Sequence, residues 1–129
     1  QKFVTSSCNS DEGNIIICDI VSGFQRTLNN FYSGCIYSIK VLSNYELAAS
    51  SYEDTMIRIY NIQTGSITKR LKGQSDFPKV LELIYERYLI SGAVDGSIIA
   101  WDLTNGVIIN EFSSISSEIK SIIFLNSTC

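Results

Sequence analysis

One pattern recurs three times along this chain, at intervals of 42 and 41 residues. Each copy holds an apolar run that ends in Cys18-Asp19, Tyr60-Asn61 or Trp101-Asp102. An acidic residue stands six positions before the first member of each pair, and a glycine stands five positions after it. Such regularity predicts one structural unit built three times, and it leaves little room for any other architecture.

The clearest copy spans residues 88–106 and reads YLISGAVDGSIIAWDLTNG. It predicts a strand, a tight turn at Asp95-Gly96, a second strand that ends in Trp101-Asp102, and a turn that closes on Gly106. The flanking segments alternate apolar and polar residues, as half-exposed strands do. Repeats of about 40–45 residues with four strands each are typical of β-propeller blades. We therefore expect an all-β chain whose repeats cover approximately residues 1–29, 35–72 and 79–113, with a final strand at 118–125.

The hairpin from Ser91 to Gly106 resembles the second hairpin of the WD40 repeat family. Residues 71–76, LKGQSD, are similar to that family's Gly-His element, with Gln74 in the place of the histidine. The resemblance implies WD40-type blades, about three four-stranded antiparallel sheets within a single segment, 1–129. Since propellers usually have about four to eight blades, it also implies a part of a larger propeller. The residues expected to hold the repeat together are Asp54, Tyr60, Gly65, Asp95, Trp101, Asp102 and Gly106.

The chain departs from the family in one respect. WD40 blades often contain a buried Asp-His-Ser/Thr-Trp hydrogen-bond network, and this chain has no histidine. Asp95 and Trp101 would fill two places, with Gln74 as a neutral substitute for a third, whereas Asp54 would have only Tyr60. Half-satisfied buried polar groups cost stability, so we expect looser blades than in a consensus repeat.

Composition argues against several classes of ligand. The net charge of −3 makes nucleic acid an improbable direct ligand, because nucleic-acid surfaces are normally basic. The four cysteines form no C-x-x-C pair, and without histidine a mixed zinc site is excluded. We expect the cysteines to pack as small apolar residues, with a disulfide or a metal as the less favoured alternative, and no cofactor.

No apolar run is long enough to span a membrane. An intracellular protein is expected, without distinction between cytoplasm and nucleus. Because Gln1 is not an initiator methionine, the chain is expected to begin inside a longer protein.

The resemblance points to a non-catalytic protein–protein interaction scaffold rather than an enzyme. The aspartates of the repeat have structural positions, and no phosphate-binding glycine loop occurs. By similarity to WD40 proteins, partner contacts are expected on the loops of one rim, where other proteins or peptides bind. The candidate partner-binding residues are Asp11, Tyr32, Tyr37, Tyr52, Glu53, Phe77, Lys79 and Val94.

Two alternatives remain open. The chain could associate with a second copy, the strand at 118–125 completing the partner's first blade, to form a six-bladed ring that binds a phosphopeptide. For that role a basic patch is needed, and its candidates are Arg58, Lys69, Arg70 and Lys72. Because side chains alternate faces along a strand, a common cluster of these four is doubtful. The other alternative is an enzyme to which this chain contributes only blades; it requires a paired carboxylate with a raised pKa.

Overall fold

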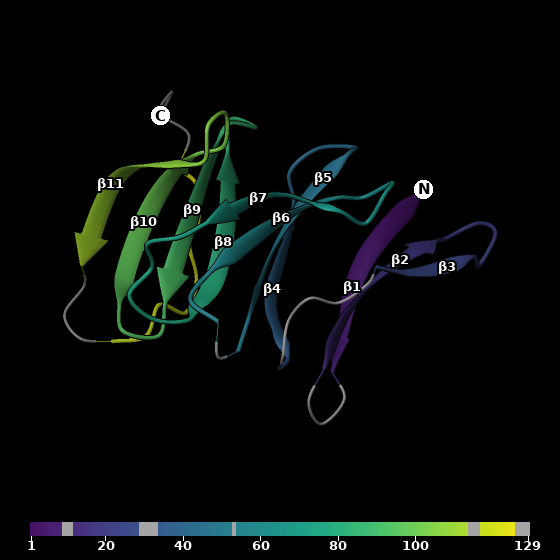
Figure 1. The fold of residues 1–129 in the computed structure, drawn as a ribbon, viewed down its shortest axis with the longest axis horizontal. Helices are drawn as coiled ribbons and strands as arrows, with labels where there is room; N and C mark the ends of the chain where they lie inside the picture. Colours follow the sequence, from purple (N-terminus) through teal and green to yellow (C-terminus); the bar gives the residue numbers. More distant parts are fainter. Residues whose placement is uncertain (9–11, 29–33, 53, 114–116, 126–129) are drawn as a thin grey trace.

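The computed structural model describes residues 1–8, 12–28, 34–52, 54–113 and 117–125. These residues form three antiparallel β-sheets that stand side by side, and no helix occurs among them (Figure 1). None of them builds a helix that is long and apolar enough to cross a membrane. The expectation of an all-β chain is confirmed.

The sheets follow the order of the chain. The first contains β1 (Lys2–Cys8), β2 (Gly13–Asp19) and β3 (Gln25–Leu28). The second contains β4 (Ile36–Val41), β5 (Glu46–Ser51), β6 (Ile57–Asn61) and β7 (Ile67–Leu71). The third contains β8 (Pro78–Ile84), β9 (Tyr88–Ala93), β10 (Ser97–Asp102) and β11 (Val107–Ser113). Every strand pairs with its neighbour in sequence, so each sheet is a simple meander.

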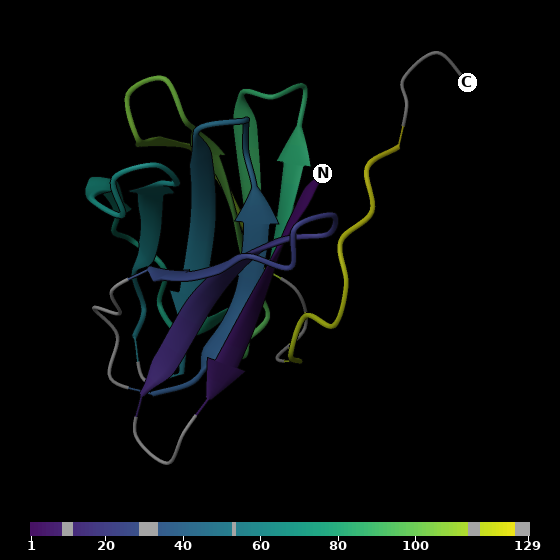
Figure 2. The ribbon, with the colours of Figure 1, turned by 90° about the vertical axis from the view of Figure 1, so that its right-hand side faces the viewer.

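The inner edge of each four-stranded sheet lies toward the next sheet. β4 lies against β1 of the first sheet and against β8 of the third. The first sheet has no strand in the place that β4 and β8 hold in the other two, which leaves β1 as its edge. Figure 2 shows the three sheets from the side, stacked with their strands roughly aligned.

Two apolar clusters hold the stack together. The first and second sheets enclose Ile15, Ile17, Leu28, Leu47 and Tyr60. The second and third enclose a larger set: Leu42, Ala48, Ile57, Ile59, Leu71, Leu81, Leu89, Ile99 and Trp101. Since each cluster takes side chains from two neighbouring sheets, stability comes mainly from sheet-to-sheet contact, as in other repeat architectures.

The three turns after β2, β6 and β10 share one geometry. The side chains of Asp19, Asn61 and Asp102 each accept hydrogen bonds from backbone N–H groups two or three residues later. The glycine that ends each turn has a positive φ, between 71° and 76°, in the region that residues with a side chain seldom adopt. The repeated Asp/Asn and Gly positions are therefore explained by backbone geometry.

The strand expected at 118–125 is not formed. Residues 117–125 pair with no strand of the described chain and run beside the third sheet (Figure 2). Ile119 donates its N–H to the carbonyl of Ala93 at 3.1 Å and packs where a side chain at Gly92 would otherwise lie. The segment packs on the third sheet in the way that the inner strand of a following blade would. It forms no strand there, because a strand needs a hydrogen-bonded partner along its edge.

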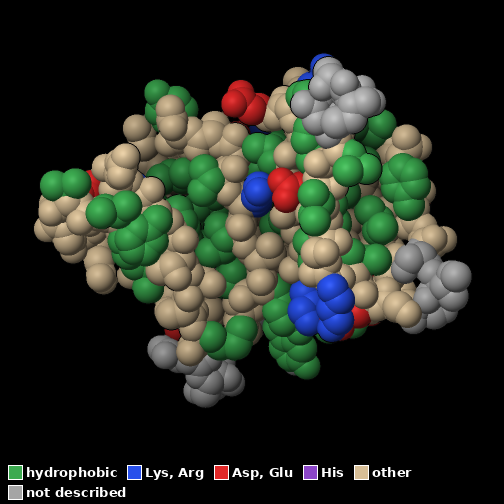
Figure 3. All heavy atoms as spheres, turned by 180° about the vertical axis from the view of Figure 1, so that it is seen from behind, with side chains coloured by type: hydrophobic (Ala, Val, Ile, Leu, Met, Phe, Trp, Pro, Cys, Tyr) green, Lys and Arg blue, Asp and Glu red, His purple; other side chains and the backbone are tan. Residues whose placement is uncertain are grey.

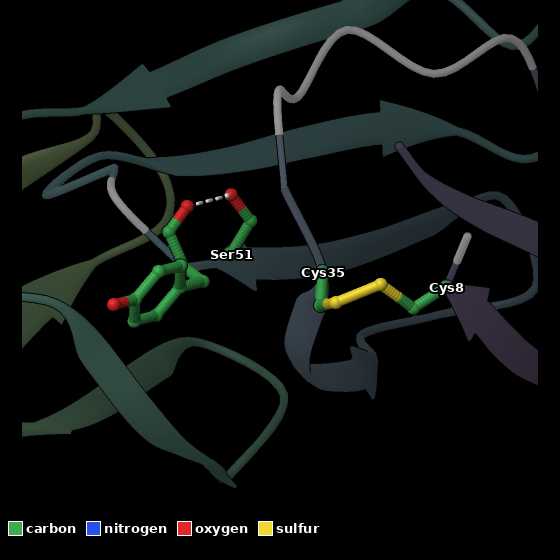
Figure 4. The surroundings of a disulfide bond; sticks show 4 residues. Cys8, Cys35 and Ser51 are labelled. Atoms are coloured by element: carbon green, nitrogen blue, oxygen red, sulfur yellow. Dashed lines mark hydrogen bonds between the residues drawn. A yellow bond between two sulfur atoms is a disulfide. The ribbon is translucent and has the colours of Figure 1, made fainter. Parts of the chain in front are cut away.

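The expectation of unpaired cysteines is wrong for two of them. Cys8, at the end of β1, and Cys35, just before β4, form a disulfide that joins the first sheet to the second (Figure 4). The two cysteines are separated by 27 positions, and the sequence did not indicate their pairing, because the packing of one sheet on the next brings them together. Cys18 is buried in β2 with a free thiol, as expected for a small apolar residue.

Candidate partner-binding rim

Two β-bulges lie at equivalent places, at Tyr37 and at Lys79. The pairing of β4 with β5 passes from Ile36 to Ser38, and the pairing of β8 with β9 passes from Pro78 to Val80. The residue skipped in each case has no partner opposite it. Bulges re-aim a side chain away from the regular alternation of a strand. The same distortion thus presents one residue per sheet at the rim, 42 positions apart.

Three aromatic rings meet at this rim. The ring centroids of Tyr37 and Tyr52 lie 5.7 Å apart in an edge-to-face arrangement, and those of Tyr52 and Phe77 lie 5.6 Å apart. Lys79 places its ammonium 5.6 Å from the centre of the Tyr37 ring. Such spacings are those of attractive aromatic and cation–π contacts. We call the four residues Tyr37, Tyr52, Phe77 and Lys79 the aromatic rim.

Lys79 is anchored by a carboxylate from the C-terminal segment. Its ammonium forms an ion pair with Glu118, whose other oxygen lies 2.5 Å from the ammonium of Lys120. The hydrogen bonds from Lys120 and then from Lys79 lower the pKa of Glu118, and the hydrogen bond to Glu118 raises the pKa of Lys79. Both groups are therefore ionised at neutral pH, and 117–125 is tied to the aromatic rim.

Five of the eight candidate partner-binding residues come together. Besides the aromatic rim, Val94 lies beside Phe77 and donates its N–H to the Phe77 carbonyl at 3.2 Å. Tyr52 is 45% exposed, and the other four are partly buried. Asp11, Tyr32 and Glu53 lie outside the described residues. The site thus draws on the second and third sheets and on the junction between them.

A chain of hydrogen bonds runs through the third sheet and is buried at Trp101, Ser91 and Gln74. The indole N–H of Trp101 donates to the hydroxyl of Ser91 at 2.8 Å, and that hydroxyl donates to the amide oxygen of Gln74 at 2.5 Å. The amide nitrogen of Gln74 donates to the hydroxyl of Ser97 at 2.7 Å, which in turn donates to Asp95 at 2.6 Å. Gln74 thus closes the network without histidine, since its amide both donates and accepts. The expectation of a half-satisfied network is wrong for this sheet.

The second sheet has no such chain. Its register places Ala49 where Ser91 stands and Tyr60 where Trp101 stands. The Tyr60 hydroxyl is buried and finds no hydrogen-bond partner among the described residues, and the same holds for the hydroxyl of Ser50. Burial accordingly raises the pKa of Tyr60 to about 12. Asp54 forms an ion pair with Arg58 at 2.9 Å instead.

The carboxylates of the turns are held ionised. Backbone N–H groups of Ser22 and Val21 lower the pKa of Asp19. The hydrogen bond from Arg87, helped by the N–H of Thr104, lowers the pKa of Asp102 to about 2. Partial burial opposes ionisation of Asp95, but hydrogen bonds from Ser75 and Ser97 outweigh it and the net pKa is lowered. These carboxylates act as hydrogen-bond acceptors that shape turns. No group of three or more metal-binding side chains occurs within the described part of the chain.

The four basic candidates form no common cluster, although Arg58 and Arg70 are neighbours across one ladder. Arg58 is opposite Arg70 in the β6–β7 ladder, while Lys69 is opposite Ile59 and so faces the other side of the sheet. Arg58 forms an ion pair with Asp54 at 2.9 Å.

Sequence reasoning did not identify two residues that lie next to the aromatic rim, Cys35 and Glu118. Cys35 precedes Phe77 by 42 residues, and the repeat spacing would have indicated its place.

Comparison with solved structures identifies the architecture. The WD40 β-propeller domain of Doa1 matches with a TM-score of 0.81 at 18% identity, over 93% of this chain and 39% of that one. The WD40 domain of Toxoplasma gondii coronin gives 0.77 at 15% identity, over 92% and 34%. The computationally designed Ika4 protein gives 0.76 at 20% identity, over 98% and 82%. Identities this low show the fold alone.

Comparison of sequences points the same way. No family model matches the chain. The TSET complex member tstF of Dictyostelium discoideum is 30% identical over 82 residues, which are 60% of this chain and 7% of that protein. An uncharacterized WD repeat-containing protein of Schizosaccharomyces pombe is 38% identical over 53 residues, 40% of this chain and 14% of that protein. The chain therefore spans a small part of these relatives' length. Its three sheets are WD40-type β-propeller blades, as the repeat and its Trp-Asp hairpin predict.

Proposed function

We propose that this chain provides three consecutive blades of a larger intracellular WD40 propeller, and that the propeller is a non-catalytic scaffold which binds another protein through the aromatic rim. The observation that carries the proposal is the meeting of Tyr37, Tyr52, Phe77 and Lys79 across two blades. Rigid aromatic side chains with polar tips dominate the binding energy of protein interfaces.

A scaffold role agrees with the proteins that this chain resembles. One curated relative is a member of a complex, and one solved structure that matches its fold is the Mitotic Checkpoint Complex, at a TM-score of 0.77 and 17% identity. The lowered pKa values of Asp19, Asp95 and Asp102 disfavour a role as catalytic acids, which would need raised values.

The outer face of the third blade supports a further blade in the native protein. A mainly apolar hollow of about 380 Å³ lies on it, lined by Ile84, Tyr88, Ile90, Ala100, Ile109 and, as its one charged residue, Asp102. The segment 117–125 already crosses the inner part of the same face, where Ile119 packs over Gly92. An apolar hollow of this kind is normally covered by another element. On the face that lies behind the view of Figure 1, hydrophobic side chains are spread among a few charged ones (Figure 3).

Two variants of the same residue type test the rim. Tyr52 follows β5 and Tyr45 precedes it, so the two tyrosines lie at opposite ends of one strand with exposures of 45% and 58%. Proteins captured from the source organism by the whole protein are compared by quantitative mass spectrometry for Tyr52→Ser and Tyr45→Ser. The proposal expects Tyr52→Ser to lose specific partners that Tyr45→Ser retains, with both variants folded. Equal capture by both would contradict a partner site at the rim.

The blade proposal has its own test. This chain alone, without further blades, is expected to self-associate or to bind a hydrophobic dye, because the face at Ile90 and Ile109 is uncovered. Light scattering and dye fluorescence measure both. A stable monomer that binds no dye would count against a larger propeller and leave the rim test unaffected.

A further inference from the structure

The disulfide lies where the edge of the first blade meets the start of the second. Cys8 ends β1, which is the edge of a blade that has no inner strand. Cys35 lies immediately before β4, with its Cα 5.1 Å from that of Cys8. The bond therefore joins the free edge of the first blade to the first residues of the second.

Close backbone contacts accompany the disulfide at this corner. An isolated bridge pairs Glu12 with Gly34. Gly13 fits so closely that a side chain there would meet the Gly34 carbonyl at 2.7 Å and the Ile36 nitrogen at 2.8 Å. The apolar cluster of Ile15, Ile17 and Leu28 holds the rest of the first sheet against the second. Loss of the covalent bond would release the corner without dispersing that cluster.

The same corner is hydrogen-bonded to the aromatic rim. The carbonyl of Cys35 accepts a hydrogen bond from the N–H of Tyr52 at 2.8 Å, and the carbonyl of Tyr52 accepts one from Ser51 at 3.2 Å (Figure 4). Tyr37, whose ring contacts that of Tyr52, stands two residues after Cys35. Both tyrosines are thus attached to the backbone that the disulfide fixes.

We propose that Cys8 and Cys35 form a thiol–disulfide redox site that sets the position of the first blade and of the aromatic rim. A dithiol reductant attacks one sulfur as a thiolate, forms a mixed disulfide and leaves as a cyclic disulfide. Two electrons and two protons convert the Cys8–Cys35 bond into two thiols. Residue Cys8 is exposed, so the reductant has access, while Cys18 is buried and takes no part. This inference goes beyond the scaffold role and holds whether or not the rim binds a protein.

Differential alkylation and hydrogen exchange test the site in the chain as it exists. Without reductant, an alkylating reagent under denaturing conditions should leave Cys8 and Cys35 unlabelled; after dithiothreitol it should label both. Reduction should speed exchange in β1 and at the Tyr52 amide by roughly one to two orders of magnitude, because a closed loop of 27 residues is opened. Exchange in β10 should change little, since its core lies between the second and third blades.

Matched cysteine variants complete the test. Cys8→Ser and Cys35→Ser should each reproduce the exchange pattern of the reduced chain and lose the response to dithiothreitol. Cys18→Ala removes a cysteine outside the pair and should keep the response. The proposal is overturned if Cys8 and Cys35 are labelled without reduction, if they pair with another chain, or if reduction leaves the Tyr52 amide unchanged. Should a serine variant fail to fold, reduction of the unaltered chain still decides between these outcomes.

Discussion

The second and third blades have the same strand order and nearly the same register, yet they treat buried polar groups in opposite ways. In the third, Trp101, Ser91, Gln74, Ser97 and Asp95 form an unbroken series of hydrogen bonds. In the second, alanine replaces the serine, and the hydroxyls of Tyr60 and Ser50 stay without a partner in the described part of the structure. The two blades nevertheless pack into one core.

The difference shows that the hydrogen-bond series is not needed to form a blade. Apolar contact between sheets supplies the main stabilisation, and the series adds specificity and rigidity where it is complete. A half-complete series would be worse than none, because each stranded group keeps its desolvation cost. The third blade has the complete series, and the second lacks it and keeps two buried hydroxyls without a described partner. The following substitutions and pH changes measure what this difference contributes to stability.

The largest effect is expected from Ser91→Ala, which makes the third blade like the second at one position. Trp101 and Gln74 would each lose a buried hydrogen bond, so the free energy of unfolding should fall by about 2–3 kcal/mol. Urea unfolding followed by tryptophan fluorescence measures the loss, and exchange in β8–β11 should rise more than in β4–β7. If Ser91→Ala lowers the free energy of unfolding no more than Ser50→Ala does, the hydrogen-bond series does not stabilise the third blade.

A second effect should appear at alkaline pH in the second blade. The folded state raises the pKa of Tyr60 from 10.0 to about 12, so the unfolded chain ionises first. The stabilisation linked to its neutral hydroxyl is complete below pH 10 and is lost as the pH rises from 10 to 12, on the order of 2 kcal/mol in all. Unfolding of the chain and of Tyr60→Phe should therefore diverge in this range. If the stability of the unaltered chain and that of Tyr60→Phe change in parallel with pH, the pKa of Tyr60 is not raised in the folded state and the prediction is wrong.

A smaller gain is expected from the turn between β8 and β9. Tyr85 and Glu86 both have positive φ, 51° and 54°, which hairpin turns normally assign to glycine or asparagine. The corresponding turn of the second blade instead uses the hydroxyl of Ser43 to accept hydrogen bonds from the backbone N–H groups of Tyr45 and Glu46. Glu86→Gly should raise stability by about 1 kcal/mol. Thermal unfolding checks this, with Glu82→Gly in the neighbouring strand as a control that should destabilise.

The smallest effect is expected from Ser50→Ala. Its hydroxyl is buried without a described partner, so removal should change stability by less than about 0.5 kcal/mol or improve it slightly. Differential scanning calorimetry has the sensitivity for this comparison. A loss above 1.5 kcal/mol would reveal a hydrogen bond that the described residues do not account for.

The sequence predicted most of the fold and part of the candidate site. The spacing of Tyr60 and Trp101 follows the backbone, because one blade must bury its apolar strands in a fixed length of chain. The Cys8–Cys35 bond and the lack of a strand at 118–125 depend on contacts between sheets, which no local pattern records. Gln74 was expected in the place of the histidine, but the completion of the network through Ser97 was not predicted, since it depends on Ser97 standing within reach of the amide.

The bulges at Tyr37 and Lys79 have a consequence for how such a surface can change over time. At both places the skipped residue makes no pair across the ladder, and one blade carries a phenol there while the other carries an ammonium. Substitution at these positions alters what the molecule displays and leaves strand pairing untouched. The second and third blades therefore each offer one position that can change without altering strand pairing, and a propeller can acquire a new binding preference one blade at a time.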